Sequence, residues 1–121
     1  MPHLLFLYLE FLHNVLLINY CLLGPPTKPK HLQVTYTSLS SLSLRWIAGF
    51  DGGFQPKFII EYRLYQSSTW TKYTVEQTGS DDDPQSLQLS HLNVNSLYEI
   101  RMSATNDVGS SSTTDVIVVG M

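Results

Sequence analysis

Cysteine is nearly absent from this sequence: Cys21 is the single one among 121 residues, and it lies outside the part in which strands are expected. A disulfide within that part is therefore excluded, and so is a zinc site built from several cysteines. The four histidines at positions 3, 13, 31 and 91 are too scattered to suggest a metal cluster or a catalytic triad. Any folded domain in this chain must rest on its hydrophobic core.

Charged residues are scarce as well. Asp, Glu, Lys and Arg make up 14% of the chain, so long solvated helices are not expected. The net charge of −3 and the lack of a basic stripe argue against a nucleic-acid partner. Hydrophobic residues amount to 43% and aromatic residues to 12%, which is enough for the core of one domain.

Catalytic, cofactor-binding and metal-binding motifs are also missing. The glycines between Gly49 and Gly53 lead toward an expected strand rather than a helix, so they do not form a phosphate-binding loop. Asp81, Asp82 and Asp83 are consecutive, whereas a calcium ion takes about six or more oxygens that converge from spaced positions. We expect a solvated loop there, no cofactor, no metal and no enzyme activity.

Residues 1–24 form an apolar segment with three interpretations. A signal peptide suits its position, but no Lys or Arg precedes the apolar part and no small-x-small cleavage site follows it. A membrane anchor is opposed by Glu10, which offsets up to about half of an apolar contribution of roughly −6 kcal/mol. In the third interpretation the segment is not a working element and belongs to a fragment or a mis-started gene model. In isolation it is expected to form an apolar helix.

Residues 25–120 are expected to form one all-β domain. The linker from Gly24 to Pro29 holds three prolines, which favour an extended chain. After it, short alternating stretches recur with turn residues between them, a pattern typical of an antiparallel sandwich. The seven predicted strands contain Leu32 and Val34; Leu42, Leu44 and Trp46; Phe58, Ile60 and Tyr62; Trp70, Tyr73 and Val75; Leu87 and Leu89; residues 98–104; and Val116 and Val118.

The clearest alternation lies between Leu92 and Gly109. Apolar residues at 98, 100, 102 and 104 alternate with polar ones, which predicts a strand with one buried face. Residues 106–109 form a turn in which Asn and Gly supply the positive φ of a tight reversal. Leu92 stands six positions before Tyr98, the spacing of a tyrosine corner, in which the phenol oxygen bonds back to the preceding connection.

This stretch resembles the F strand and F–G turn of a fibronectin type III domain, in which a Leu, a Tyr and an Ala-x-Asn-x-x-Gly recur in this order. The resemblance covers Pro25 to about Val119 and implies an immunoglobulin-like sandwich of seven strands. Residues that match the structural core of the family are Trp46, Tyr62, Leu92 and Tyr98.

The chain departs from the family pattern in two places. Val94 and Asn95 stand where the family often has Pro or Gly between the Leu and the Tyr of the corner. The turn at residues 106–109 lacks an Arg-Gly-Asp, so the integrin contact of some family members is not carried over.

The run from Trp46 to Gly53, Trp-Ile-Ala-Gly-Phe-Asp-Gly-Gly, resembles the type III domain of nephrin-like and Sidestep-like immunoglobulin-superfamily adhesion proteins. The resemblance implies an extracellular, non-catalytic interaction or spacer module of a cell-adhesion or cell-recognition receptor. Its partners would be neighbouring immunoglobulin or type III domains or a cell-surface ligand, with membrane association through residues 1–24 or the parent protein. An accessory spacer domain of a secreted multidomain enzyme stays open as the alternative. A cytokine-receptor module is disfavoured, because cysteines and a Trp-Ser-x-Trp-Ser run are missing.

Two surfaces are candidates for partner binding. In this topology the turns at residues 49–56 and 106–109 lie at the same end of the sandwich. That end would carry Phe50, Asp51, Phe54, Asn106 and Asp107. The second candidate is the outward face of one sheet, where a cross-strand ion pair between Glu61 and Arg101, worth under about 1 kcal/mol, is the simpler interpretation. Its residues would be Ile59, Glu61, Arg63, Tyr65, Tyr73, Glu99 and Arg101.

Overall fold

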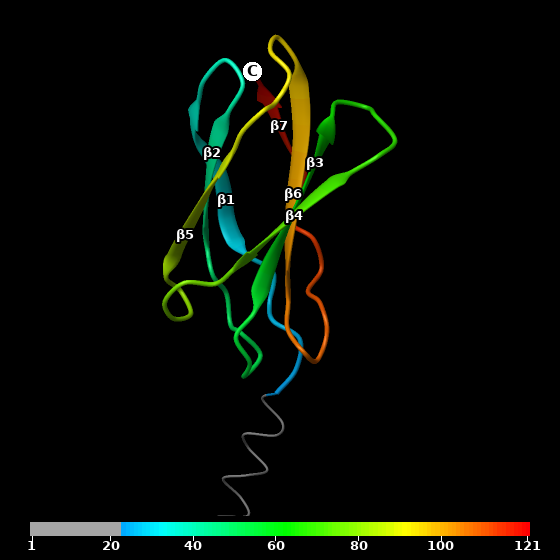
Figure 1. Ribbon diagram of the computed structural model, residues 1–121. Coiled ribbons are helices and arrows are strands. Elements are labelled where there is room, and N and C mark those ends of the chain that lie inside the picture. The colour runs from blue at the N-terminus through cyan, green and yellow to red at the C-terminus, as the bar shows by residue number, and fades with distance from the viewer. Residues whose placement is uncertain (1–22) are drawn as a thin grey trace, which may run out of the picture.

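The computed structural model describes residues 23–121, which fold into seven strands in two antiparallel sheets. One sheet has three strands in the order β1–β2–β5: β1 (Lys30–Thr37), β2 (Leu42–Ile47) and β5 (Pro84–Leu89). The other has four strands in the order β4–β3–β6–β7: β4 (Thr71–Glu76), β3 (Lys57–Leu64), β6 (Leu97–Thr105) and β7 (Ile117–Gly120). The predicted all-β, seven-stranded sandwich is confirmed, and Figure 1 shows its two sheets facing each other. The predicted apolar helix lies outside the described residues, apart from the last two positions of the segment.

The core forms where the alternating residues of the two sheets meet. Trp46 on β2 and Phe58 on β3 are each 1% exposed, and their rings pack edge to face with centroids 5.4 Å apart. Such an aromatic pair adds about 0.5–1.5 kcal/mol to the gain from burying its area. Tyr62 is partly buried and packs against the same core. The fully buried positions from β2, β3 and β6 include Leu42, Leu44, Ile60, Ile100 and Met102.

A tyrosine corner closes the connection between β5 and β6. The backbone N–H of Asn93 donates to the hydroxyl oxygen of Tyr98 at 2.7 Å, and Leu92 is 7% exposed beneath it. Asn95 has a φ of 51°, a left-handed conformation that asparagine tolerates better than most residues. This conformation explains how the corner forms although Pro and Gly are missing from the connection.

Two details of the four-stranded sheet differ from the sequence analysis. Tyr73 pairs with Ile60, and directly paired residues share a face, so the prediction that Tyr73 lies on the outward face is wrong. The last strand begins at Ile117, one residue after Val116, and it turns Val119 into the core while Val118 stays exposed. In both cases the apolar character of the stretch predicted the strand, but the pairing register decides which side chain faces inward.

The described chain enters the sandwich at one end and leaves it at the other, as Figure 1 shows. At the entry, the N–H of Gly24 donates to the carbonyl of Gly52 at 2.9 Å. At the exit, the N–H of Met121 donates to the carbonyl of Ser96 at 2.9 Å. Between residues 23 and 121 there is no helix with the length and hydropathy needed to cross a membrane.

Candidate binding surfaces

The entry end of the sandwich, which we call the loop end, consists of residues 23–27, 48–56 and 106–109. Asn106 ties its three segments together, because its amide donates to the carbonyls of Gly24 at 2.8 Å and Asp51 at 2.9 Å. The side-chain oxygen of Asn106 accepts from the N–H groups of Val108 at 2.8 Å and Gly109 at 3.1 Å. The two turns that the sequence analysis placed at one end are thus in direct contact.

The five residues predicted at the loop end have different surroundings. Phe50 and Phe54 are 45% and 39% exposed, and Asp107 is exposed as well. Asp51 is partly buried and accepts the N–H of Gly53 at 2.7 Å, while Asn106 uses its amide internally. The phenylalanines and Asp107 are therefore exposed at the loop end, whereas Asp51 and Asn106 hold the turns in place. Two further exposed apolar residues widen this surface: Leu23 and Val108.

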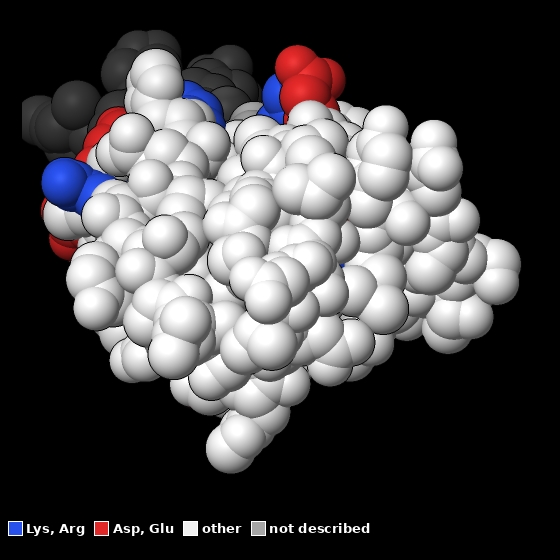
Figure 2. Space-filling model, turned by 90° about the horizontal axis from the view of Figure 1, so that it is seen from above, with Lys and Arg blue, Asp and Glu red and all other residues white. Residues whose placement is uncertain are grey.

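The opposite end, the exit end, was not singled out from the sequence. Hydrogen bonds gather its segments: the N–H of Leu92 donates to the carbonyl of Ser40 at 2.8 Å, and that of Tyr65 donates to the carbonyl of Leu97 at 2.9 Å. Figure 2, which looks onto this end, shows charged side chains only at its rim. The exposed apolar residues here are Leu39, Leu64, Tyr65, Val94 and Leu97. Leu39, 80% exposed within a serine-rich turn, was the one signal that the sequence offered.

The outward face of the four-stranded sheet carries two cross-strand ion pairs. Arg101 Nη2 lies 3.2 Å from Glu61 Oε2, which confirms the predicted pair, and Arg63 Nε lies 2.6 Å from Glu99 Oε2. Both glutamates are buried, at 8% and 9% exposure, although they face outward. These pairs are therefore shielded from water more than ordinary surface pairs are.

Trp70, just before β4, provides the shield. The guanidinium carbons of Arg63 and Arg101 each lie 4.1 Å from the centre of its ring, a distance typical of cation–π contacts. The prediction that Trp70 belongs to a strand is wrong by one residue, because β4 begins at Thr71. The contact with the arginines was not predicted, since it depends on how the segment before β4 meets the sheet. The centre of this face is thus occupied by the protein's own side chains.

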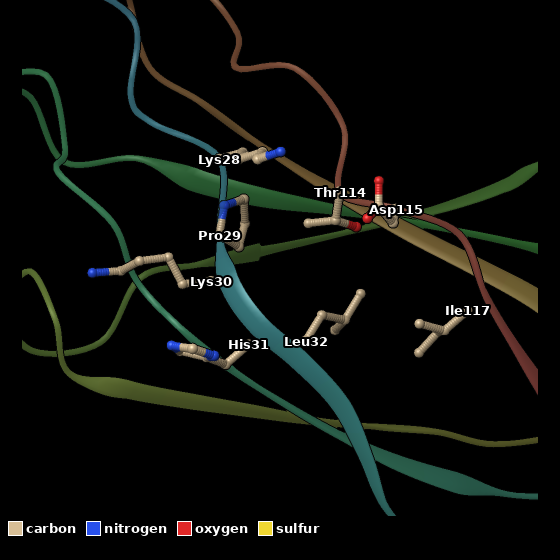
Figure 3. Close-up of a pocket in the computed structure, with 8 residues that line it drawn as sticks. All are labelled: Lys28, Pro29, Lys30, His31, Leu32, Thr114, Asp115 and Ile117. Carbon is tan, nitrogen blue, oxygen red and sulfur yellow. The ribbon is translucent and has the colours of Figure 1, made fainter.

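A hollow of about 510 Å³ lies between the beginnings of β1 and β7. In Figure 3, Leu32 and Ile117 lie across from each other, while Lys30 and His31 point away from Thr114 and Asp115. Lys30 instead pairs with Asp82, its Nζ lying 2.6 Å from Oδ1. The hollow does not bring a nucleophile and a base together among the residues that line it.

The three consecutive aspartates have separate partners. Asp82 bonds Lys30, Asp83 accepts the N–H of Ser80 at 2.7 Å, and Asp81 accepts the N–H of Asp51 at 3.3 Å. Within residues 23–121 no three His, Cys, Asp or Glu side chains are grouped so that they could hold a metal ion.

Comparison with protein families gives a match to the Fibronectin type III domain over residues 26–119. The chain belongs to this family. The match confirms the resemblance inferred from the tyrosine corner and the turn at residues 106–109.

The relatives of the chain include cell-adhesion proteins. Mouse (Mus musculus) "Cell adhesion molecule DSCAML1" is 29% identical over 105 residues, and human (Homo sapiens) "Cell adhesion molecule DSCAM" is 26% identical over 103 residues. Rat (Rattus norvegicus) nephrin is 29% identical over 102 residues, in agreement with the resemblance of the Trp46–Gly53 run. These alignments cover 84–86% of this chain but only 5–8% of the relatives, so the chain corresponds to a small part of each.

Solved structures show the same fold. The FN1–FN3 domains of chicken CNTN1 align with a TM-score of 0.67 and 22% identity over 80% of this chain and 33% of that one. A structure described as "Myokine structure" aligns with a TM-score of 0.65 and 16% identity over 79% of this chain and 97% of that one. The chain is therefore a type III module related in sequence to cell-adhesion proteins.

Proposed function

We propose that this chain is a non-catalytic extracellular module of a cell-adhesion or cell-recognition receptor. In this proposal it spaces neighbouring domains and presents the loop end to a protein partner. The observation that carries the proposal is the combination of adhesion-protein relatives with a chain that enters and leaves at opposite ends of a rigid sandwich. That arrangement suits a row of domains joined head to tail.

The two ends of the sandwich support different parts of this proposal. The exit end has few charges, and its exposed apolar residues offer a surface for a following domain of the same polypeptide. The loop end exposes Phe50 and Phe54 beside Asp107, and aromatic side chains dominate the binding energy of many protein interfaces. Its turns are held by Asn106, so little ordering entropy would be lost on binding.

The proposal is tested by secreting the full chain from a eukaryotic cell, as a fusion that assembles into tetramers. Binding to a panel of intact cell lines is compared before and after their surface proteins are removed with trypsin. We expect saturable binding to at least one cell line and its loss after trypsin. Retention of the chain inside the secreting cell, or binding that trypsin leaves unchanged, would contradict an extracellular protein-binding module.

A further inference from the structure

Strand β4 forms one edge of the four-stranded sheet, since it pairs only with β3. This edge is regular: all six residues of β4 pair with β3 without a register shift, and only Val75 among them is not exposed. The other three edges are less regular or shorter, because β1 has two register shifts, β5 begins at a proline and β7 has four residues. A regular exposed edge presents unpaired N–H and C=O groups to a further strand.

The hydrogen bonds to β3 leave every second residue of β4 with free backbone groups. The N–H of Gln77, just after β4, donates to the carbonyl of Pro56 at 3.2 Å. In an antiparallel pair, residues bonded in this way alternate with residues whose groups point to the other side. The N–H and C=O groups on the open edge therefore belong to Lys72, Thr74 and Glu76. The side chains of these three residues lie on the outward face of the sheet, as does Glu61, which is paired with Lys72.

The sequence of β4, Thr-Lys-Tyr-Thr-Val-Glu, is complementary to itself in antiparallel orientation. When two copies meet edge to edge with Thr74 opposite Thr74, Lys72 of one copy lies opposite Glu76 of the other. In the same register Tyr73 lies opposite Val75. Opposite charges, paired threonines, and an aromatic beside a β-branched side chain are the cross-strand pairs that stabilise a sheet. The residues with free backbone groups also face one another, so a ladder of hydrogen bonds can form.

This register completes a row of alternating charges on the outward face. Within one copy, Arg101 lies 3.2 Å from Glu61, and Glu61 is paired with Lys72. Glu76 is paired with Lys57 in the same way. Across two copies the row is therefore Arg101, Glu61 and Lys72, followed by Glu76 and Lys57 of the second copy. Lys72 and Glu76 take part in none of the ion pairs between residues 23 and 121, so both are available.

We propose that two copies of this chain associate through β4, antiparallel and about a two-fold axis at Thr74, so that their four-stranded sheets become continuous. A lysine on an edge deters pairing with other strands, whereas the second copy meets Lys72 with Glu76. Interfaces below about 1,200 Å² are weak and transient, and one short edge belongs to this class. We expect a dissociation constant on the order of 10⁻⁵–10⁻³ M. The inference uses β4 alone and does not depend on the proposed function.

The test measures self-association of the full chain by sedimentation velocity between about 1 μM and 1 mM. We expect a monomer–dimer equilibrium that weakens as salt is added, because salt screens the row of charges. Lys72→Glu and Glu76→Lys each place like charges opposite one another, so each should raise the dissociation constant at least about tenfold. Lys28→Glu makes the same charge change at an exposed residue outside β4 and should leave it unchanged. A monomer over the whole range would overturn the proposal.

Mixing the two variants identifies the surface. A Lys72→Glu chain facing a Glu76→Lys chain has opposite charges at both ends of the edge again. The equimolar mixture should therefore form a heterodimer about as strong as the dimer of the unaltered chain. Far-UV circular dichroism checks that each variant folds, and the titration of the unaltered chain decides the proposal even where a variant does not. Association that both substitutions leave unchanged, or that the mixture does not restore, would place the contact on another surface and overturn the proposal.

Discussion

Single side chains decide how the connections of this domain are held. The hydroxyl of Tyr98 accepts a backbone N–H, and the side chain of Asn106 bonds to the other two segments of the loop end. The sequence predicted the tyrosine corner from the spacing between Leu92 and Tyr98, because the corner is a local arrangement. It did not predict the bonds of Asn106 to Gly24 and Asp51, since these depend on how distant loops meet.

Tyr98→Phe removes only the hydroxyl and leaves the N–H of Asn93 without its acceptor. We expect the free energy of unfolding to fall by about 1–3 kcal/mol, measured by urea denaturation. Tyr65→Phe, at a side chain that is 46% exposed, serves as the matched control and should change stability little. Equal effects of the two substitutions would show that the corner bond contributes nothing specific.

Trp70→Ala removes the ring that covers the ion pairs of Arg63 and Arg101. Two cation–π contacts at a partly exposed site are worth about 0.5–1 kcal/mol each, so unfolding should become easier by about 1–2 kcal/mol. Trp70→Phe keeps a weaker aromatic face, so its melting temperature should lie between those of Trp70→Ala and the unaltered chain. A melting temperature of Trp70→Ala equal to that of the unaltered chain would refute the role assigned to the ring.

Among the strands, the period-two alternation predicted where each strand lies, and the pairing register decided which of its faces turns toward the core. β2, β3 and β6 alternate strongly, so their inward residues were evident from the sequence. β7 is an edge strand with apolar residues on both faces, so its alternation says little, whereas in the edge strand β4 Tyr73 and Val75 share a face but are only partly covered. The assignment of Tyr73 failed because alternation alone does not say which face of β4 turns inward; the pairing of Tyr73 with Ile60 does. The contact of Trp70 with the arginines was missed because Trp70 precedes β4 and reaches them only in the folded sheet.

In the turn between β2 and β3, Gly52 packs closely against the other two segments of the loop end. Gly52 has a φ of 75°, and a Cβ there would overlap the Gly24 carbonyl and the Asn106 amide. Left-handed strain of roughly 1–2 kcal/mol and a weakened hydrogen bond of about 1 kcal/mol predict a loss of about 2–3 kcal/mol for Gly52→Ala. Gly24→Ala is the control, because nothing lies near its added Cβ. If both variants unfold at the same urea concentration, the proposed close contact of Gly52 with the Gly24 carbonyl and the Asn106 amide would be refuted.

At the scale of the whole molecule, the scarcity of cysteine and charge indicated a domain held by its core, and the structure of residues 23–121 agrees. The exit end, with its charges at the rim, was not predictable. Its residues come from loops that are far apart in the sequence and meet only in the folded sandwich, so no local pattern marks them.

In the proposed function the loop end, rather than the exit end, meets the partner. The most direct measurement compares the apparent affinity of three tetrameric fusions for cells: the unaltered chain, Phe50→Ala/Phe54→Ala and Leu39→Ala. Leu39 is 80% exposed at the exit end, so it controls for the loss of an exposed apolar side chain elsewhere. Circular dichroism first confirms that all three fusions are folded. We predict that the phenylalanine variant binds at least about tenfold more weakly, as expected for interface aromatics. Leu39→Ala should bind like the unaltered chain. Equal binding by all three, or a loss confined to Leu39→Ala, would contradict the account.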